Sequence, residues 1–497
     1  MASDAYASEI PRHPVIQSSA ARDLQRALII SLVLLTTLAV LSAIGPLYRA
    51  QFLAEVDVNE GWNAYHVDAI LHGLPLYPSP DLLITNNYPP LYYYLLAGLS
   101  SIFGDTIFIG RALSFMAVLA VGVESFLILR RLAVGQLPAF AAAVAYFATM
   151  CRLFDGRVAV NDPQLPAQAI MGLGLLLFLI ERERGHRWFV LSAGTMVLAG
   201  FFKHNVVAVP AATFLFLLLE DRKSAARFAA VGAGMALGGL WLCALAYGPS
   251  FAFNVFEPRP YRLLRGLKSL EDLHRVPVQI ILWVGYAVGC KDAGRGRLIN
   301  LLCLAGLAES FGFRMAEEVD RNAGYDLLFA LHLAFGAVLE RAGDIYPRAL
   351  SASAYRAVLL TATSIRLLFG EPMDSFNVLI DPAMVQYFRD AEAATIADVA
   401  RVRRIPGPVF CESPYTCFMA GKPFAVDGIN LQFRVTMGGE PCDVIDRQLA
   451  SGELTYVPNR TGSPNLRPYR FVLPLEYRLD ATGEKLTAPV SQISCGK

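Results

Sequence analysis

Eleven long apolar runs recur along the chain, and this recurrence constrains the fold more than any other feature. A helix needs about 20 apolar residues to cross a bilayer. The first run, residues 27–47, reaches that length and is too long for a cleavable signal peptide. We therefore predict an α-helical polytopic membrane protein with about 11 transmembrane helices. The other runs lie at residues 107–129, 136–150, 166–180, 188–202, 205–219, 228–247, 276–290, 298–313, 324–340 and 352–369.

The composition supports this class and excludes one kind of partner. Hydrophobic residues make up 55% of the 497 residues and charged residues only 17%, whereas ordinary soluble proteins contain roughly 25% charged residues. The net charge is +1, so the chain has no basic excess that would attract nucleic acid. The lipid bilayer is the expected surrounding, and no nucleic-acid partner is expected.

The basic residues between the runs indicate which loops face the cytoplasm, because Lys and Arg concentrate there. The N-terminal segment contains Arg22 and Arg26, and placing it inside puts five basic connections inside as well. Residues 88–103 must then not cross the membrane, since a crossing would invert every later loop. We interpret them as an interfacial or re-entrant helix rich in tyrosine. The five connections contain Arg130/Arg131, Arg182/Arg184/Arg187, Arg222/Lys223/Arg227, Lys291/Arg295/Arg297 and Arg341/Arg348.

This layout divides the chain into three parts. Residues 1–26 form a cytoplasmic N-terminal segment, and residues 27–370 form a transmembrane domain with a long outer loop at 48–106. Residues 371–497 form an extracytoplasmic tail. Most of the polar residues outside the basic connections therefore belong to the outer face.

The tail has the pattern of a small C-terminal α/β domain. Residues 408–411 and 454–457 resemble short strands, and residues 383–401 resemble an amphipathic helix. The spacing of Cys411 and Cys417 fits a disulfide better than a zinc site. The tail also contains Cys442 and Cys495, and the sequence leaves the pairing of the four cysteines open.

Two acidic residues follow the first run. Asp57 and Glu60 would share one face of a helix because they are three residues apart. A carboxylate at a membrane surface suits a general base, which takes the proton of an attacking hydroxyl group. The alternative is that these acids only cap a helix or face solvent.

The second outer loop and the next outer turn carry further polar candidates. Arg157 and Asp162 lie between two apolar runs, and Asp162 before proline also suits a helix cap. Lys203, beside His204, interrupts an apolar tract; it could bind a phosphate as a point charge or extend its ammonium group to the interface. Asn322 lies in a later polar loop whose side chains could contact sugar hydroxyls or cap a helix.

The loop that contains Arg259, Arg262, Arg265 and Lys268 is basic although it is placed outside. An anionic lipid headgroup would explain this charge. The alternative is that long loops translocate largely regardless of charge. The sequence leaves both readings open.

The N-terminal part of the chain resembles the C superfamily of membrane glycosyltransferases (GT-C). The branch in question contains protein O-mannosyltransferases, the lipid A aminoarabinose transferase and their bacterial relatives. The resemblance covers about residues 27–220, and the later runs match only in layout. Four features carry it: the acids Asp57 and Glu60, the segment Tyr88-Pro-Pro-Leu91, the pair Gly110-Arg111, and Arg157 with Asp162 followed by Lys203.

The resemblance implies a GT-C-like architecture and a hexosyl- or pentosyltransferase. The donor would be a polyprenyl-phosphate sugar, the acceptor a lipid, glycan or protein, and the transfer would invert the anomeric centre. Asp57 or Glu60 would be the base, and many relatives carry Asp-Glu where this chain has Asn59-Glu60. The choice between the two acids therefore stays open. Asp162 would assist catalysis, and the substrate-binding candidates are Tyr88, Arg111, Arg157, Lys203, His204 and Asn322.

The resemblance also implies a location in the plasma (inner) membrane of a bacterium. No cofactor is indicated by the residues, since the chain has no HExxH and no paired CxxC motif. Some relatives use a divalent metal, so metal dependence stays open.

Two other functions fit a chain with many spans. A secondary transporter or lipid flippase would place its polar residues near the midplane and show repeated halves. A non-catalytic scaffold would use the tail to recognise a partner. The charged residues of this chain concentrate in outer loops, which favours chemistry at an interface.

Overall fold

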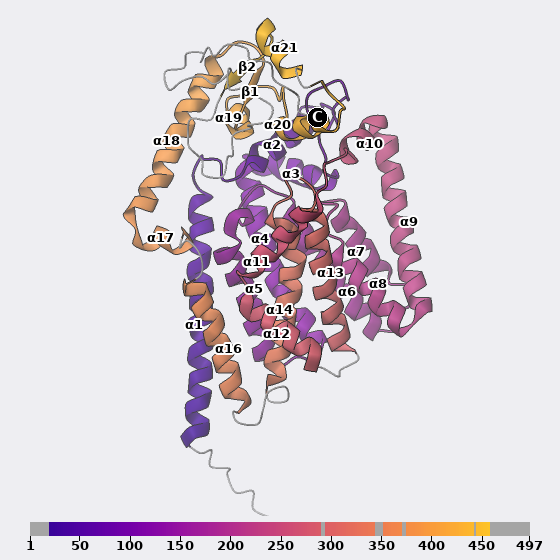
Figure 1. The fold of residues 1–497 in the computed structure, drawn as a ribbon, viewed down its shortest axis with the longest axis vertical. Coiled ribbons are helices and arrows are strands. Elements are labelled where there is room, and N and C mark those ends of the chain that lie inside the picture. The colour runs from indigo at the N-terminus through magenta and orange to yellow at the C-terminus, as the bar shows by residue number, and fades with distance from the viewer. Residues whose placement is uncertain (1–18, 290–293, 343–350, 370–373, 442–443, 458–497) are drawn as a thin grey trace, which may run out of the picture.

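The computed structural model describes residues 19–289, 294–342, 351–369, 374–441 and 444–457. The protein is a bundle of long helices with a cap of shorter helices and two short strands at one end (Figure 1). Each of the eleven predicted apolar runs coincides with a helix. These helices are α1 Ser19–Arg49, α4 Thr106–Arg131, α5 Gln136–Leu153, α6 Gln164–Glu183, α7 Val190–Gly200, α8 Ala208–Glu220, α9 Arg222–Tyr247, α12 Pro277–Gly289, α13 Arg295–Arg314, α14 Tyr325–Glu340 and α16 Ala352–Phe369.

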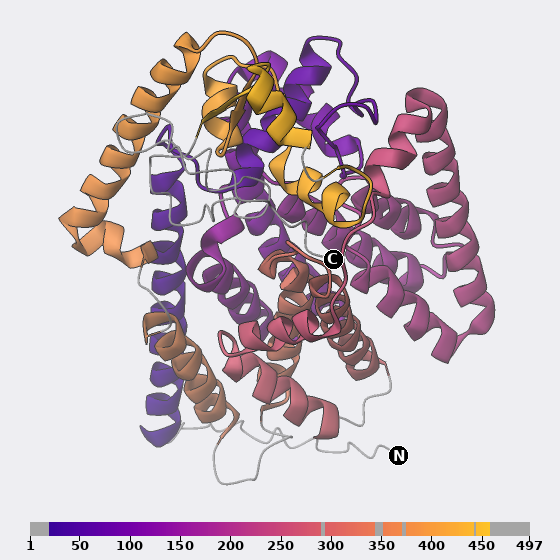
Figure 2. The same ribbon diagram turned by 45° about the horizontal axis from the view of Figure 1, so that its top comes forward.

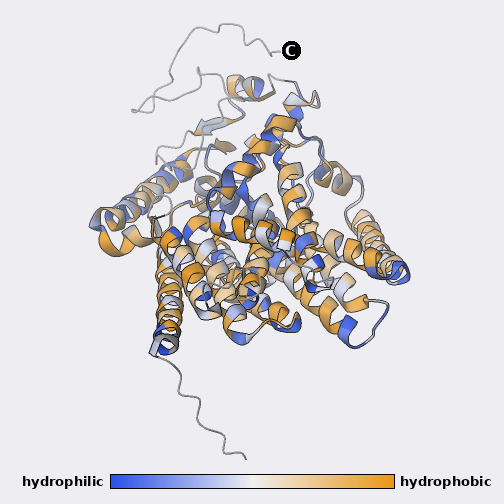
Figure 3. Cartoon of the chain, turned by 60° about the horizontal axis from the view of Figure 1, so that its bottom comes forward, coloured by the Kyte–Doolittle hydropathy of each residue, from blue (hydrophilic) through white to orange (hydrophobic). Residues whose placement is uncertain are grey.

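Within the described residues, six helices are long and apolar enough to cross a membrane: α1, α4, α6, α9, α13, and α14 with the turn before it. Hydrophobic residues dominate these long helices (Figure 3). The protein is therefore a multi-pass helical membrane protein. The number of eleven crossings stays a prediction, because α7, α8 and α12 have only 11 to 13 residues each.

Local chemistry sets where these helices begin and end. Asp105 caps α4, since its Oδ1 accepts hydrogen bonds from the backbone N–H groups of Ile107 at 2.8 Å and Phe108 at 3.0 Å. The last turn of α4 contains Arg130 and Arg131, where positive charge complements the helix dipole. The apolar run between cap and arginines then packs against α5 and α6.

The basic connections meet at one end of the bundle. Arg131 pairs with Glu183 at 2.5 Å, and Arg182 pairs with Glu220 at 2.8 Å. Gly135 N–H donates to a carboxylate oxygen of Glu340 at 3.0 Å. Loops predicted to share one side of the membrane therefore lie together, although the orientation relative to the cell stays a prediction.

The first outer loop folds into two helices, α2 Val58–Leu71 and α3 Leu91–Phe103. The predicted interfacial helix is α3, whose 13 residues extend about 20 Å at 1.5 Å per residue. That length is well short of the roughly 30 Å hydrocarbon core. The shorter elements of the remaining outer loops are η1 Asp155–Arg157, α10 Pro249–Val255, η2 Leu263–Leu267, α11 Lys268–Leu273 and η3 Arg321–Gly324.

Of the tail elements, α19 Pro414–Met419 and α20 Gly428–Thr436 lie over the first outer loop, near α2 (Figures 1 and 2). The predicted strands are β1 Val409–Cys411 and β2 Thr455–Val457, which pair in parallel with Val409 opposite Thr455. The predicted amphipathic helix is α18 Pro382–Arg404, and a disulfide joins Cys411 to Cys417. Cys442 and Cys495 lie outside the described residues. The other tail helices are α17 Asp374–Ile380 and α21 Val444–Ser451.

The contact between tail and loop depends on one glycine. A Cβ at Gly61 in α2 would lie 2.1 Å from the backbone nitrogen of Tyr415 in α19. No side chain fits there, so glycine allows the two helices to approach backbone to backbone. The tail thereby forms a roof over α2. The boundaries of the three predicted parts of the chain stay predictions.

Candidate active site

Asp57 caps α2 and faces the centre of a polar network. Its Oδ1 accepts a hydrogen bond from the backbone N–H of Asn59 at 2.9 Å, and the same oxygen pairs with Nη1 of Arg157. The side chain is 16% exposed. Among the described contacts none involves Oδ2 of Asp57, so this oxygen is available to a ligand. The capping role and a chemical role are compatible in this geometry.

Glu60 lies one turn further along α2 and is fully buried. Both its oxygens pair with Arg111 of α4, Oε1 with Nε at 2.7 Å and Oε2 with Nη2 at 2.8 Å. The backbone N–H groups of Val56 at 2.9 Å and Asn161 at 3.3 Å also donate to Glu60. The remaining N–H groups of Arg111 donate to the backbone oxygens of Ala50, Phe52 and Ala54.

These contacts take all five N–H donors of Arg111. The side chain is only 3% exposed. In this arrangement Arg111 has no donor left for a phosphate, and it ties the first outer loop to α4.

Gly110 of α4 leaves the space that the side chain of Asn161 occupies. A Cβ at this position would lie 2.2 Å from Oδ1 of Asn161. That oxygen accepts a hydrogen bond from the Tyr92 hydroxyl at 2.6 Å, and Nδ2 of Asn161 donates to the backbone oxygen of Glu60 at 3.2 Å. The pair Gly110-Arg111 therefore joins the two outer loops through Asn161 and Glu60.

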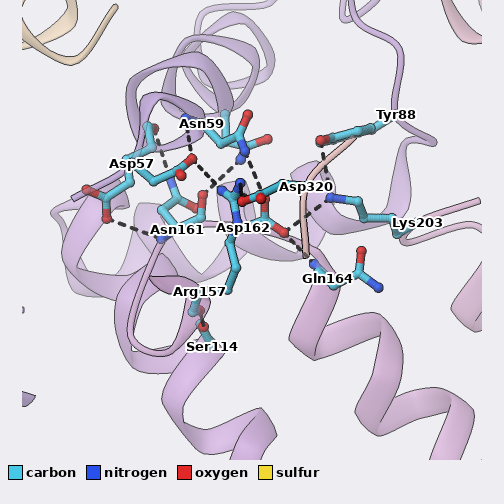
Figure 4. A network of polar contacts seen from close by, with 12 residues as sticks. Asp57, Asn59, Tyr88, Ser114, Arg157, Asn161, Asp162, Gln164, Lys203 and Asp320 are labelled. Atoms are coloured by element: carbon cyan, nitrogen blue, oxygen red, sulfur yellow. Dashed lines mark hydrogen bonds and ion pairs between the residues drawn. The ribbon is translucent and has the colours of Figure 1, made fainter. Parts of the chain in front are cut away.

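Arg157 lies between three carboxylates (Figure 4). It pairs with Asp57, with Asp162 at 3.7 Å and with Asp320 at 3.3 Å. Ser114 of α4 holds its backbone oxygen with a hydrogen bond of 2.8 Å. One guanidinium thus links the first outer loop, the second outer loop and the loop before η3.

Lys203 lies on the other side of Asp162 (Figure 4). Its Nζ is 3.2 Å from Oδ1 of Asp162 and donates to the hydroxyl of Tyr88 at 3.2 Å. The ammonium also lies 4.2 Å from the centre of the Tyr88 ring, a cation–π contact. The side chain is 4% exposed, so this cation is held inside the site and does not extend into the headgroup layer.

Of the three catalytic candidates, Asp57 and Asp162 have pKa values shifted in opposite directions. Burial raises the pKa of Asp57, and Arg157 opposes the shift without cancelling it. Burial also acts to raise the pKa of Asp162, but the charges of Lys203 and Arg157 outweigh it and the pKa is lowered. Asp162 therefore stays ionised as a counter-ion, while Asp57 is the better proton acceptor. Opposite shifts in one site are typical of an acid–base arrangement.

The network gathers most of the predicted site residues and places the others at its edge. His204 is exposed, with its ring centroid 6.4 Å from that of Tyr88. Asn322 is buried in η3, and the described residues show no hydrogen bond between it and the network. Asp320, two residues earlier, makes the contact instead. Its position in the same polar loop was the only sequence signal for it.

Asn59 was also missed as a site residue. Its Nδ2 donates to Oδ2 of Asp162 at 3.3 Å. A carboxylate at this position would place a third negative charge beside Asp57 and Asp162, whereas the amide donates a hydrogen bond. The departure from the Asp-Glu pair of many relatives is therefore matched to its surroundings.

The side chains that commonly hold metal ions in proteins are those of His, Cys, Asp and Glu. Across the described residues, no group of three or more is arranged to hold a metal ion. The three carboxylates around Arg157 are paired with its guanidinium, and Asp162 also pairs with Lys203.

The described helices form a membrane bundle whose carboxylate and cation site lies under an outer loop roofed by the tail. The sequence profile of the dolichyl-phosphate-mannose-protein mannosyltransferase family matches residues 87–245. No curated protein sequence matches significantly. The match of the profile and the similarity of the fold confirm the resemblance to the GT-C superfamily of membrane glycosyltransferases.

The structural similarity spans nearly the whole chain. The structure of ArnT from Cupriavidus metallidurans in the apo state matches with a TM-score of 0.58 and 14% identity, covering 91% of this chain and 97% of that one. The same protein bound to undecaprenyl phosphate matches with a TM-score of 0.55 and 16% identity over the same shares. At these identities the similarity defines the fold.

Proposed function

We propose that this protein is a membrane glycosyltransferase that moves a sugar from a polyprenyl-phosphate-linked donor to an acceptor at the outer face of the membrane. The single observation that carries the proposal is that Asp57, with a free carboxylate oxygen, and Lys203, with a buried ammonium group, lie on either side of Asp162 (Figure 4). Support comes from the fold of ArnT, which was captured with undecaprenyl phosphate, and from the mannosyltransferase profile.

Asp57 is the general base in this proposal. Its Oδ1 is used by the helix cap and by Arg157, which leaves Oδ2 to accept the proton of an acceptor hydroxyl. Glu60 accepts four hydrogen bonds and is fully buried. A carboxylate so fully engaged cannot reach a substrate without breaking the ion pair with Arg111. We therefore assign Glu60 and Arg111 to holding the loop.

Lys203 binds the phosphate of the donor. Charge develops on that phosphate as the sugar leaves, and a preorganised ammonium in a water-poor site stabilises it. Asp162 holds Lys203 in place, and Tyr88 covers it. His204 lies at the exposed edge of this position.

The reaction is a single displacement. The acceptor oxygen forms a bond to the anomeric carbon, the bond from that carbon to the phosphate oxygen breaks, and the hydroxyl proton passes to Asp57. The polyprenyl phosphate leaves with the bonding electron pair. One displacement inverts the anomeric configuration. The acceptor is a lipid, glycan or protein, and the sugar is a hexose or pentose.

The proposed location is the plasma (inner) membrane of a bacterium. Residues 1–26 are cytoplasmic, residues 27–370 form the membrane domain, and residues 371–497 lie on the outer side. The basic connections that meet at the end opposite the site support this orientation.

The test is transfer of labelled sugar from polyprenyl-phosphate donors to extracted membrane acceptors by the purified protein in liposomes. We expect transfer by the wild type and its loss in Lys203→Ala. Normal binding of polyprenyl phosphate without any transfer would contradict the proposal. It would favour a transporter or flippase if labelled lipid then crossed the bilayer, and a scaffold if it did not.

A further inference from the structure

Four side chains in successive contact connect the roof formed by the tail with the proposed donor site. Asp427 caps α20, and its Oδ2 accepts a hydrogen bond from the indole N–H of Trp62 in α2 at 2.7 Å. The ring of Trp62 packs edge to face on the ring of Tyr88, with centroids 5.0 Å apart. The ring of Tyr88 in turn covers the ammonium of Lys203 at 4.2 Å. The first and last members are separated by 224 residues in sequence, from Lys203 to Asp427.

The first two of these side chains, Asp427 and Trp62, have little freedom to move. Asp427 is 3% exposed and Trp62 is 7% exposed. The backbone N–H of Asp427 donates to the backbone oxygen of Leu83 at 2.8 Å, which fixes the cap of α20 on the first loop. Its Oδ2 also accepts from Nδ2 of Asn430 at 2.6 Å. The carboxylate thus presents a fixed acceptor to the indole.

The orientation of the Tyr88 ring depends on Trp62. The backbone of Tyr88 is held elsewhere, since its oxygen accepts from the hydroxyl of Tyr77 at 3.0 Å and its N–H donates to Oδ1 of Asn86 at 3.2 Å. Those bonds hold the backbone and leave the plane of the ring to its side-chain contacts. These are the edge-to-face contact with Trp62, the cation–π contact and hydroxyl hydrogen bond with Lys203, and the tilted ring contact with His204.

We infer that Asp427 is a positioning residue that acts through Trp62 and Tyr88 to hold Lys203 where the donor phosphate binds. The tail therefore does more than cover the site, because one of its side chains contributes to affinity for the lipid phosphate. This inference rests on the function proposed above, in which Lys203 binds that phosphate.

Two substitutions interrupt this path of contacts at different points. Asp427→Asn replaces one acceptor oxygen of the carboxylate by an NH₂ group. At least one of the N–H groups of Trp62 and Asn430 that donate to the carboxylate then faces this NH₂ group and loses its acceptor. Trp62→Phe keeps a ring against Tyr88 but removes the indole N–H. We expect each to weaken binding of undecaprenyl phosphate roughly 2- to 10-fold, the range of one aromatic or hydrogen-bonding contact.

The matched control is Tyr65→Phe. It also removes one hydrogen bond between α2 and the tail, from the Tyr65 hydroxyl to the backbone oxygen of Lys422 at 2.9 Å. The ring of Tyr65 stacks on Phe424, away from Tyr88. We expect it to leave the affinity for undecaprenyl phosphate unchanged.

The experiment measures the dissociation constant of undecaprenyl phosphate for the full chain in lipid nanodiscs, with thermal unfolding recorded for each variant. We expect the double variant Asp427→Asn/Trp62→Phe to bind as weakly as the weaker single variant, since both changes break one path. Wild-type affinity in both single variants, or an equal loss in Tyr65→Phe, would overturn the inference.

Lys203→Ala separates this inference from the proposed function. If Lys203→Ala binds undecaprenyl phosphate like the wild type, the donor site itself is wrong. If Lys203→Ala alone loses affinity, the donor site stands and the role of Asp427 is wrong.

Discussion

Asp57→Asn is the substitution that most sharply tests the assignment of the base. Asparagine is as good a helix cap as aspartate, so its Oδ1 can still accept the N–H of Asn59 and α2 keeps its start. Arg157 keeps Asp162 and Asp320 as partners. The variant should therefore fold with near wild-type stability. It lacks only the ability to take a proton, and loss of a general base lowers the rate about 10²- to 10⁴-fold.

Glu60→Gln should behave differently. It leaves the guanidinium of Arg111 buried beside a neutral amide, and breaking a buried ion pair costs about 3–5 kcal/mol. We expect reduced thermal stability and low yield, with any loss of activity following the loss of folded protein. The assay compares sugar transfer per folded molecule with thermal unfolding for the two variants.

Two results would refute this reasoning. The first is activity of Asp57→Asn within tenfold of the wild type. The second is a Glu60→Gln protein that is as stable as the wild type yet inactive, because the base would then be Glu60. The pH profile gives an independent check: burial raises the pKa of Asp57, so activity should fall as the pH drops through a value above the ordinary range of about 3.9 for aspartate.

Three further predictions follow from the packing. Lys203→Met, which keeps a long side chain without the charge, should weaken binding of polyprenyl phosphate, measured as a rise in its dissociation constant; unchanged affinity would exclude Lys203 from the donor site. Gly110→Ala should lower stability by about 1–3 kcal/mol in thermal unfolding, because its Cβ meets Asn161, whereas Gly98→Ala, with nothing within 4 Å, should not. Burial raises the pKa of Glu55 from 4.5 to about 8, so the unfolded state ionises first as the pH rises and the wild type loses stability across that window. Glu55→Gln should therefore unfold at a higher temperature than the wild type at pH 8 and at the same temperature near pH 4.5; a pH-independent difference would contradict this.

Features that depend on local sequence were predictable. Each apolar run became a helix because a chain in lipid must satisfy its backbone hydrogen bonds internally. Asp57 was recognisable as a helix cap and caps α2. Asp162 was recognisable in the same way; its Oδ1 accepts the N–H of Gln164 at the start of α6, although Pro163 takes the N-cap position. The disulfide between Cys411 and Cys417 agrees with the preference for a disulfide over a zinc site, whereas the sequence left the pairing of the four tail cysteines open.

Features that depend on contacts between distant residues were not predictable. Glu60 and Arg111 are 51 residues apart, and the sequence offers several arginines as partners for each acid. The packing of α2 near α4 engages both oxygens of Glu60 with Arg111, whereas the described contacts of Asp57 use only its Oδ1. The partnership of Trp62 with Asp427 across 365 residues is of the same kind.

The most direct test of the central claim is the anomeric configuration of the product formed from a labelled polyprenyl-phosphate sugar by the reconstituted protein. We predict transfer with inversion by the wild type and a rate lowered about 10²- to 10⁴-fold in an Asp57→Asn variant that still binds the lipid. Transfer with retention, or equal transfer by Asp57→Asn, would contradict a single displacement with Asp57 as the base.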